Sequence, residues 1–254
     1  MHRCPSLGSC LPTLTRKRAL LATSLIWFAG GCGPGAATPM PEPPSILPSL
    51  LGPPTGEVKP VIAGTQGFVD IEGGPGAAPA NATIRVTDLD KTDVPYSSKA
   101  FADGHFVVSL PVDYNDELRF EWQYGDKRSK PTDVLFLQAG TSSFRLQPSP
   151  RFDCVQLTPG FVLEFANTSA DTLTLQIENQ CASDLSVGSA TLRRSLPDFV
   201  LPTGTPGTYP PGNVASLAVS HVATGAASEE NTLFVALSQG GTTIRYPITL
   251  SAQP

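Results

Sequence analysis

The chain has 254 residues, of which 40% are hydrophobic and only 15% are charged, a composition typical of a globular protein and not of a disordered or collagen-like one. Proline (26 residues) and glycine (23 residues) together make up nearly a fifth of the chain, and they favour turns and linkers over the long helices of a helical bundle. The formal net charge of −5 argues against nucleic-acid binding, which needs clustered lysine and arginine.

Residues 1–31 have the plan of a secretory signal peptide, because the basic block 16–18 stands directly before the apolar run 19–29. This run of 11 residues is shorter than the ~20 residues that cross a bilayer as a helix, so we do not expect a permanent transmembrane helix. Removing residues 1–31 takes away four basic residues and no acidic one, which changes the formal net charge from −5 to −9.

The end of this segment, Phe28-Ala29-Gly30-Gly31-Cys32, resembles the lipobox of bacterial lipoproteins, although Ala29 stands where that family usually has leucine. The resemblance implies that Cys32 becomes the new N-terminus and carries diacylglycerol and an acyl chain such as palmitate. Because each buried methylene contributes ~0.8 kcal/mol, such chains hold a protein on a membrane. Gly33, which is not acidic, implies sorting to the outer membrane. The alternative is an ordinary secretory signal cleaved near Gly31, which leaves Cys32 unmodified.

Residues 32–60 are predicted to be a linker behind the lipidated cysteine. Nine prolines lie between Gly33 and Pro60, with little charge and no sustained periodicity, which is typical of a stiff spacer. At ~3.1 Å per residue such a spacer could reach roughly 80 Å. In the alternative interpretation, the apolar patch Ile46, Leu47, Leu50 and Leu51 docks on the first domain and shortens this reach.

Residues 61–140 are predicted to form a β-sandwich, because polar and apolar residues alternate in several short segments separated by turn residues. These segments are 68–71, 83–87, 105–110, 118–122 and 134–137. The segments 67–69, 82–86, 102–106 and 125–131 resemble bacterial immunoglobulin-like and carboxypeptidase-regulatory-like modules. In the Ala-Asp-Gly-x-Phe hairpin of this pattern, Asp103 and Gly104 are expected to supply the positive φ angles of a tight turn. Such modules share no single function.

Residues 141–254 are predicted to form a second β-sandwich. The expected strands are 161–165, 173–177, 185–192, 215–219, 233–237 and 244–250. The run from Asp153 to Asn179 resembles the ASPM/SPD-2/hydin-type sandwiches of bacterial surface proteins. Pro247 predicts an edge strand or a bulge, since proline cannot donate to a ladder. The predicted fold class is therefore all-β, with two tandem immunoglobulin-like β-sandwiches behind a signal peptide and a proline-rich linker.

The cysteines predict one disulfide bond. Cys4 and Cys10 leave with the signal peptide and Cys32 is the lipidation candidate, so Cys154 and Cys181 remain as a pair in an exported domain. Closing this loop is expected to stabilise the second domain by roughly 3 to 4 kcal/mol. A metal or redox site is the less favoured interpretation, because the two thiols lack the close spacing of such sites.

The sequence offers few candidates for catalysis, and we predict no catalytic residue, metal ligand or cofactor. It contains no G-x-S-x-G, H-E-x-x-H or G-K-[ST] motif. His105 is expected to be an exposed strand residue and His221 a loop residue. Trp122 is expected to lie in the core of its domain instead of on a sugar-stacking surface.

Two acidic runs, 88–93 and 113–117, are the basis of two alternative functions. Their oxygen atoms could hold Ca²⁺, or serve as the paired carboxylates of a glycan-active enzyme. Neither run follows the EF-hand spacing, so solvated turn residues are the favoured interpretation.

The sequence as a whole predicts a cell-envelope lipoprotein that acts as a non-catalytic structural, adhesion or binding module. The lipid anchor gives it a membrane as partner, and an envelope protein or a glycan is the expected second partner. A carboxylate-dependent glycan-active enzyme and a calcium-stabilised surface module are the alternatives. The sequence does not define an oligomeric state.

Overall fold

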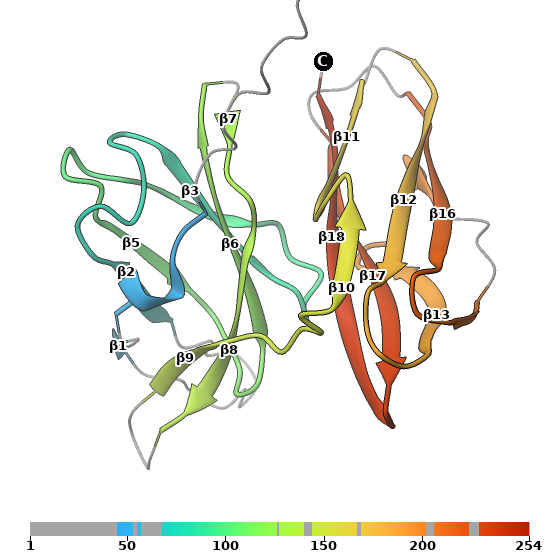
Figure 1. Ribbon diagram of the computed structural model, residues 1–254. Helices are drawn as coiled ribbons and strands as arrows, with labels where there is room; N and C mark the ends of the chain where they lie inside the picture. The colour runs from blue at the N-terminus through green and yellow to red at the C-terminus, as the bar shows by residue number, and fades with distance from the viewer. Residues whose placement is uncertain are drawn as a thin grey trace, which may run out of the picture. The chain divides into compact units, whose positions relative to one another are not determined.

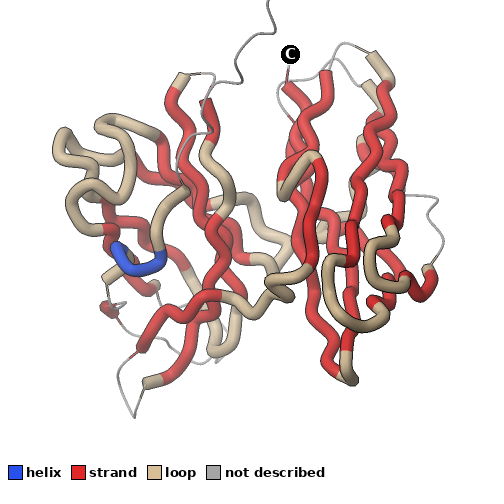
Figure 2. Tube along the Cα trace, in the orientation of Figure 1, coloured by secondary structure: helices blue, strands red, loops and turns tan. Residues whose placement is uncertain are grey.

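The computed structural model describes residues 45–52, 55–56, 68–125, 127–139, 144–166, 169–201, 206–223 and 229–253. Strands and loops make up nearly all of these residues, and the helix described is one short 3-10 turn, η1 (Pro48–Leu50) (Figure 2). The predicted all-β class is therefore confirmed. Among the residues described, no helix has the length and apolar character that a membrane crossing needs. The predicted signal peptide and Cys32 lie outside the described residues.

The first sandwich consists of two antiparallel sheets. One has the strand order β1-β2-β5, formed by β1 (Thr55–Gly56), β2 (Val69–Gly73) and β5 (Phe106–Leu110). The other has the order β4-β3-β6-β8-β9, formed by β3 (Thr83–Asp88), β4 (Tyr96–Lys99), β6 (Glu117–Tyr124), β8 (Thr132–Gln138) and β9 (Phe144–Pro148), with the short β7 (Lys127–Arg128) beside β6 (Figure 1). The apolar side chains of alternate strand positions meet between the sheets and form one core.

Both ends of this sandwich reach beyond the predicted boundaries of residues 61 and 140. Ile46 is fully buried in the first core, and its carbonyl oxygen accepts a hydrogen bond of 2.5 Å from Thr132 Oγ1. The segment around it therefore docks on the sandwich, as the alternative interpretation held. At the other end, β9 pairs with β8, and Phe144 is buried in the first core. The prediction that the second module includes residues 144–148 was wrong, because the apolar side chain of Phe144 completes the first core.

The hairpin at Asp103 and Gly104 differs in detail from the prediction. Gly104 has a φ of +84°, but Asp103 is not among the described residues with positive φ. The Gly104 N–H donates to the carbonyl oxygen of Phe101 at 3.0 Å, which closes a three-residue hairpin turn that needs one left-handed position. The Asp103 carboxylate instead accepts hydrogen bonds from the backbone N–H and Nδ1 of His105, at 3.1 Å and 2.6 Å.

The second sandwich also has two sheets with its own apolar core. One has the order β10-β12-β16-β14, formed by β10 (Val155–Thr158), β12 (Asp171–Asn179), β14 (Phe199–Val200) and β16 (Val214–His221). The other has the order β11-β18-β17-β13-β15, formed by β11 (Val162–Ala166), β13 (Leu185–Leu192), β15 (Gly207–Tyr209), β17 (Glu229–Gln239) and β18 (Thr242–Gln253). Only β11 and β18 are parallel among the described pairs. The chain crosses from the first of these sheets to the second at Pro159 and Gly160.

Pro247 lies where β18 has a strand on one side only. β17 pairs with β18 along its whole length, whereas β11 pairs with it from Thr249 onward. Pro247 is therefore at a sheet edge, which agrees with the sequence prediction and with the missing N–H of proline. Its carbonyl oxygen accepts a hydrogen bond of 2.6 Å from Arg119 of the first sandwich.

Candidate functional site

The candidate site is a charged interface between the two sandwiches, centred on the polar side of β6. Leu118, Phe120 and Trp122 of this strand face the first core. Glu117, Arg119 and Glu121 alternate with them, and these charged residues are also buried, with Arg119 and Glu121 each 1% exposed. Two of them make contacts that lead to the second sandwich: Arg119 donates to Thr249 of β18, and Glu121 accepts from Arg128, which also donates to Glu230 of β17.

Arg119 occupies the centre of this interface. Its Nε and Nη2 donate to the two carboxylate oxygens of Asp133 at 2.7 Å and 2.9 Å, a paired geometry that gives strong charge-assisted hydrogen bonds. Its Nη1 donates to Thr249 Oγ1 at 2.8 Å, and its Nη2 also donates to Pro247 in the second sandwich. One guanidinium group therefore bonds to both sandwiches at once.

Arg119 and Asp133 both stay charged in spite of their burial. Burial favours the neutral forms, but the charge of Asp133 outweighs it and raises the pKa of Arg119. For Asp133, burial acts to raise the pKa. The charges and hydrogen bonds of Arg119 and Arg151 outweigh burial, so the pKa of Asp133 lies below its ordinary value. A buried pair of this kind is strongly destabilising to break, because the remaining charge is left in a dry environment.

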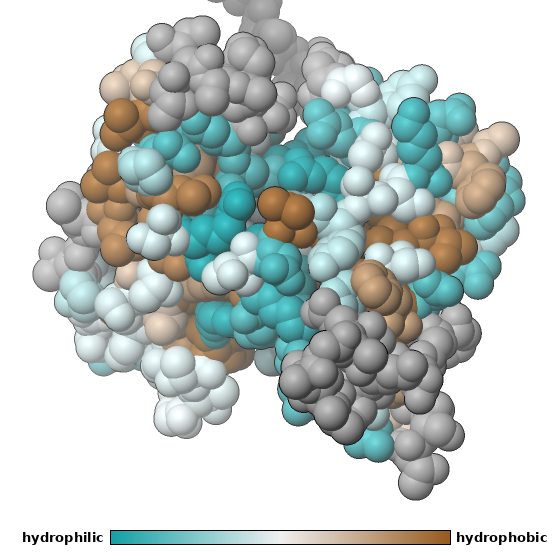
Figure 3. Space-filling view, turned by 180° about the vertical axis from the view of Figure 1, so that it is seen from behind, coloured by the Kyte–Doolittle hydropathy of each residue, from teal (hydrophilic) through white to brown (hydrophobic). Residues whose placement is uncertain are grey.

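A second set of ion pairs continues from Glu121 to the second sandwich. Arg128 Nη2 lies 2.6 Å from Glu121 Oε2 and 3.1 Å from Glu230 Oε1 of β17. Arg85 Nη1 lies 2.5 Å from the other carboxylate oxygen of Glu230. Glu230 of the second sandwich is thus held between two arginines of the first. A space-filling view from behind shows hydrophilic residues gathered along the middle of the molecule, with hydrophobic residues on either side (Figure 3).

The two acidic runs do come together, as a calcium site would require. Carboxylate oxygens of Asp88, Asp90 and Asp116 all lie within 4.8 Å of one another. The Lys91 ammonium lies among them, with Nζ 2.9 Å from Asp116, 3.0 Å from Asp113 and 3.2 Å from Asp88. The expectation of solvated turn residues was therefore wrong for Asp88 and Asp116, which are buried and paired with an internal cation.

The crowding of carboxylates at this place perturbs their protonation. Burial, followed by the charge of Asp116, raises the pKa of Asp88 to about 7, and Lys91 offsets only part of this effect. The pKa of Lys91 is raised as well: burial lowers it, but hydrogen bonds to Asp116 and Asp113 outweigh burial. Asp88 is consequently a carboxylate that can change its charge near neutral pH.

Two arginines of the second sandwich hold the same loop. Arg193, directly after β13, donates to the backbone carbonyl oxygens of Asp88, Lys91 and Asp93, with Nη2 2.7 Å from that of Asp93. Arg245 of β18 donates to Asp90 at 2.8 Å. The loop 88–93 is thus a docking element between the sandwiches.

The described residues also line two cavities of about 380 Å³ each. The first, which we call the edge cleft, is bounded by residues 128–131 of the first sandwich and by residues 155–164 at the edges of the second. The other is lined by Leu47, Leu50, Trp122 and the segment 76–79. Trp122 is 4% exposed and belongs to the first core, as predicted.

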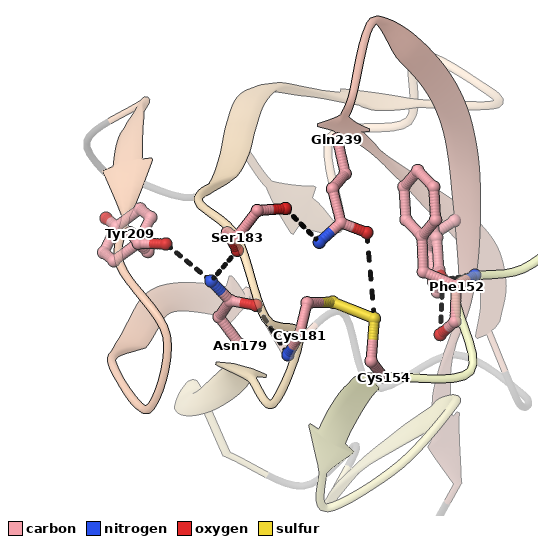
Figure 4. The surroundings of a disulfide bond; sticks show 8 residues. Phe152, Cys154, Asn179, Cys181, Ser183, Tyr209 and Gln239 are labelled. Atoms are coloured by element: carbon pink, nitrogen blue, oxygen red, sulfur yellow. Dashed lines mark hydrogen bonds between the residues drawn. A yellow bond between two sulfur atoms is a disulfide. The ribbon is translucent and has the colours of Figure 1, made fainter.

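The predicted disulfide bond joins Cys154 and Cys181, with a sulfur–sulfur distance of 2.03 Å. It links the loop before β10 to the second residue after the end of β12. Close to it, the fully buried Asn179 donates to the carbonyl oxygens of Ser183 and Tyr209 at 3.0 Å and 2.7 Å (Figure 4). The bond therefore reinforces one end of the second sandwich.

Each of the two histidines described lies next to a carboxylate. His105 is half-buried beside Asp103, and its ring stacks on Phe101 with centroids 4.1 Å apart. The loop position expected for His221 was wrong: it lies in β16, with its side chain buried between Phe165 and Phe199 and Nε2 2.9 Å from Glu229. The aromatic side chains around it explain this burial. Neither histidine lines a described cavity.

Sequence analysis missed the interface arginines. The signal that could have revealed them is the Glu117-x-Arg119-x-Glu121 pattern, in which opposite charges occupy one face of a strand. A solvent-exposed face gives the same pattern, so the sequence alone does not separate the two cases.

No protein-family model matches the chain, and no curated protein matches it. Among solved structures, it is similar to the VesB protease of Vibrio cholerae, at 12% identity and a TM-score of 0.36, over 70% of this chain and 64% of that protein. A protein of unknown function from Porphyromonas gingivalis W83 matches at 15% identity and 0.32, over 75% of this chain and 92% of the other. Trypsin-activated alpha-2-macroglobulin from Escherichia coli matches at 12% identity and a TM-score of 0.29, over 80% of this chain and 18% of that protein. These likenesses are too distant to bear on function.

Proposed function

We propose that this protein is a cell-envelope lipoprotein, attached to the outer membrane through Cys32, whose two sandwiches act as a non-catalytic structural, adhesion or binding module. The observation that supports this function best is the charged interface. Because Arg119 bonds to both sandwiches, they present their outer surfaces in a fixed arrangement, as a display or scaffold module requires.

We further propose that the second sandwich is immunoglobulin-like. Its order β10-β12-β16-β14 corresponds to the A-B-E-D sheet of that fold, and β18-β17-β13 corresponds to G-F-C. The relationships to carboxypeptidase-regulatory-like and ASPM/SPD-2/hydin-type modules belong to the same proposal.

No specific observation favours the two alternatives. A glycan-active enzyme would need carboxylates exposed to substrate, but Asp116 and Glu117 are bound to Lys91 and Arg151 and do not line a described cavity. A calcium site at Asp88, Asp90 and Asp116 would have to displace the Lys91 ammonium.

The test is the mass of the N-terminal peptide of the mature protein from a detergent-phase membrane fraction. We expect a diacylglycerol-modified Cys32 in the unchanged protein and a soluble protein in the Cys32→Ser variant. An Ala36→Ser variant, which leaves the cysteine in place, is the control and should stay in the membrane fraction. An unmodified N-terminus near residue 32, with every variant in the soluble fraction, would contradict lipid attachment through Cys32.

A further inference from the structure

Arg128 of β7 has hydrogen-bond donors to which the described part of the chain offers no acceptor. Its Nη2 donates to Glu121 and Glu230, at 2.6 Å and 3.1 Å. Its Nε and Nη1 are buried and have no hydrogen-bond partner among the described residues. The whole side chain is only 7% exposed. Buried donors without an acceptor are uncommon in folded proteins, because they lose their bonds to water and gain none in return.

Arg128 also lines the edge cleft. Of the two cavities described above, this one alone has Arg128 in its wall. Its volume of about 380 Å³ lies within the range of ordinary binding cavities. An oxygen atom of a ligand in the cleft can therefore supply the acceptor that Arg128 lacks.

The charges around Arg128 favour a neutral ligand. Glu230 pairs with both Arg85 and Arg128, and Glu121 pairs with Arg128 as well. Burial acts to lower the pKa of Arg128, but the charges of Glu121 and Glu230 outweigh burial and raise it. The guanidinium group thus stays charged, and its charge is already compensated. A further carboxylate would be repelled by the two glutamates, whereas a neutral carbonyl oxygen would not.

The remaining wall of the edge cleft is mostly apolar. Its apolar residues come from both sandwiches and are Pro131, Val155, Leu157, Pro159, Phe161 and Val162. A ligand that fits this lining offers apolar surface and carbonyl oxygens and brings few N–H donors, since each donor would need an acceptor of its own. A proline-rich segment has this chemistry, because proline has an apolar ring and no N–H, and the polyproline helix leaves its carbonyl groups unbonded.

We propose that the edge cleft binds a proline-rich segment of a partner protein, whose backbone carbonyl oxygens accept hydrogen bonds from Nε and Nη1 of Arg128 while its proline rings pack on Leu157 and Phe161. Docking of preformed polyproline helices in aromatic-lined grooves is a general mode of peptide recognition. The inference deepens the binding role proposed above, on which it rests, by naming the chemistry of the partner.

The probe is an end-capped, uncharged peptide of three Pro-Pro-Ala repeats, titrated into the purified mature protein in detergent with arginine labelled by nitrogen-15. The controls are a peptide with alanine in place of every proline, which restores the N–H donors, and acetate, which is an anionic acceptor. We expect saturable binding of the proline peptide only. At saturation, the Nε–H resonance of Arg128 should shift and its exchange with water should slow at least about tenfold, because the donor gains an acceptor.

Matched variants locate the site. Arg128→Lys keeps a cation beside Glu121 and Glu230 but removes the planar fork of donors, so we expect binding to weaken at least about tenfold. Arg145→Lys makes the same chemical change at an exposed position of β9 and should leave binding unchanged. Phe161→Leu keeps an apolar side chain and removes the aromatic ring, and it should weaken binding about threefold or more.

The proposal is overturned if the proline peptide does not bind, if the alanine peptide or acetate binds as tightly, or if Arg128→Lys, folded by its thermal transition, binds as the unchanged protein does. If Arg128→Lys does not fold, the unchanged protein decides, since an Nε–H resonance of Arg128 that is unaltered at saturation contradicts the contact. Because the assay does not depend on lipid, its failure is distinguishable from failure of the anchor. A lipidated protein without peptide binding refutes the cleft, and a non-lipidated protein that binds refutes the anchor.

Discussion

The two faces of β6 are both buried, but by opposite kinds of side chain. On one face, Leu118 and Phe120 join an apolar core, where burial is favourable whatever the detailed orientation of the neighbours. On the other, Arg119 and Glu121 are buried against the second sandwich, where each charge needs a partner in the right place. The first core therefore depends on apolar side chains at alternate positions, whereas the joining of the two sandwiches depends on individual contacts between charged groups.

The largest effect should come from Arg119→Met, which leaves Asp133 buried with only Arg151 as a described cationic partner. We expect a loss of about 3–5 kcal/mol in the free energy of unfolding, measured by chemical denaturation. The control is Arg145→Met in β9, an exposed position where the change should stay within about 0.5 kcal/mol. Equal effects of the two substitutions would contradict the interface.

On the apolar side of the comparison, Ile46→Ala should lower the free energy of unfolding by about 2–4 kcal/mol, because a fully buried side chain of the first core is truncated. Leu47→Ala, at a neighbouring side chain that is 54% exposed, is the matched control and should have little effect. If both variants unfold like the unchanged protein, the segment before η1 is a linker and not part of the sandwich.

Loss of the disulfide bond should destabilise the second sandwich, in which it joins the loop before β10 to the residues after β12. Replacing both Cys154 and Cys181 by serine should cost about 2–4 kcal/mol, seen as a lower Tm. The control is Ser186→Ala, which removes only an exposed hydrogen bond to Thr208 and should leave Tm nearly unchanged. A Tm unaffected by the double replacement would show that the bond does not contribute to stability.

The smallest effect is the pH dependence of the acidic cluster. Because the folded pKa of Asp88 is raised to about 7 from an unfolded value near 3.9, the native state binds the proton more tightly, and stability from this group falls as pH rises from about 4 to 7. Asp88→Asn should therefore raise stability at pH 8 by roughly 1–3 kcal/mol and flatten this decline. The exposed Asp93→Asn is the control. A gain that is the same at pH 4.5 and pH 8 would contradict the assignment.

Much of the fold was predictable, because period-two alternation is a local signal. The segments around Ile84, Phe106 and Leu175 alternate in sequence and form strands as predicted. The short strands β7, β14 and β15 were not predicted, since two or three residues carry no periodicity.

The candidate site could be predicted only in part. Cys154 and Cys181 were paired by elimination, and the two acidic runs were recognised, but the position of Lys91 among the acids depends on the folding of two separate loops. The burial of Arg119 depends on a sandwich more than a hundred residues further along the chain. Alternation indicates which residues share a face, and it does not show what covers that face.

Calorimetric unfolding tests most directly whether the charged interface joins the two sandwiches into one unit. We predict a single transition for the unchanged protein, with calorimetric and van 't Hoff enthalpies that agree, and two separate transitions for Arg119→Met. Two independent transitions in the unchanged protein, unaltered by the substitution, would contradict the account.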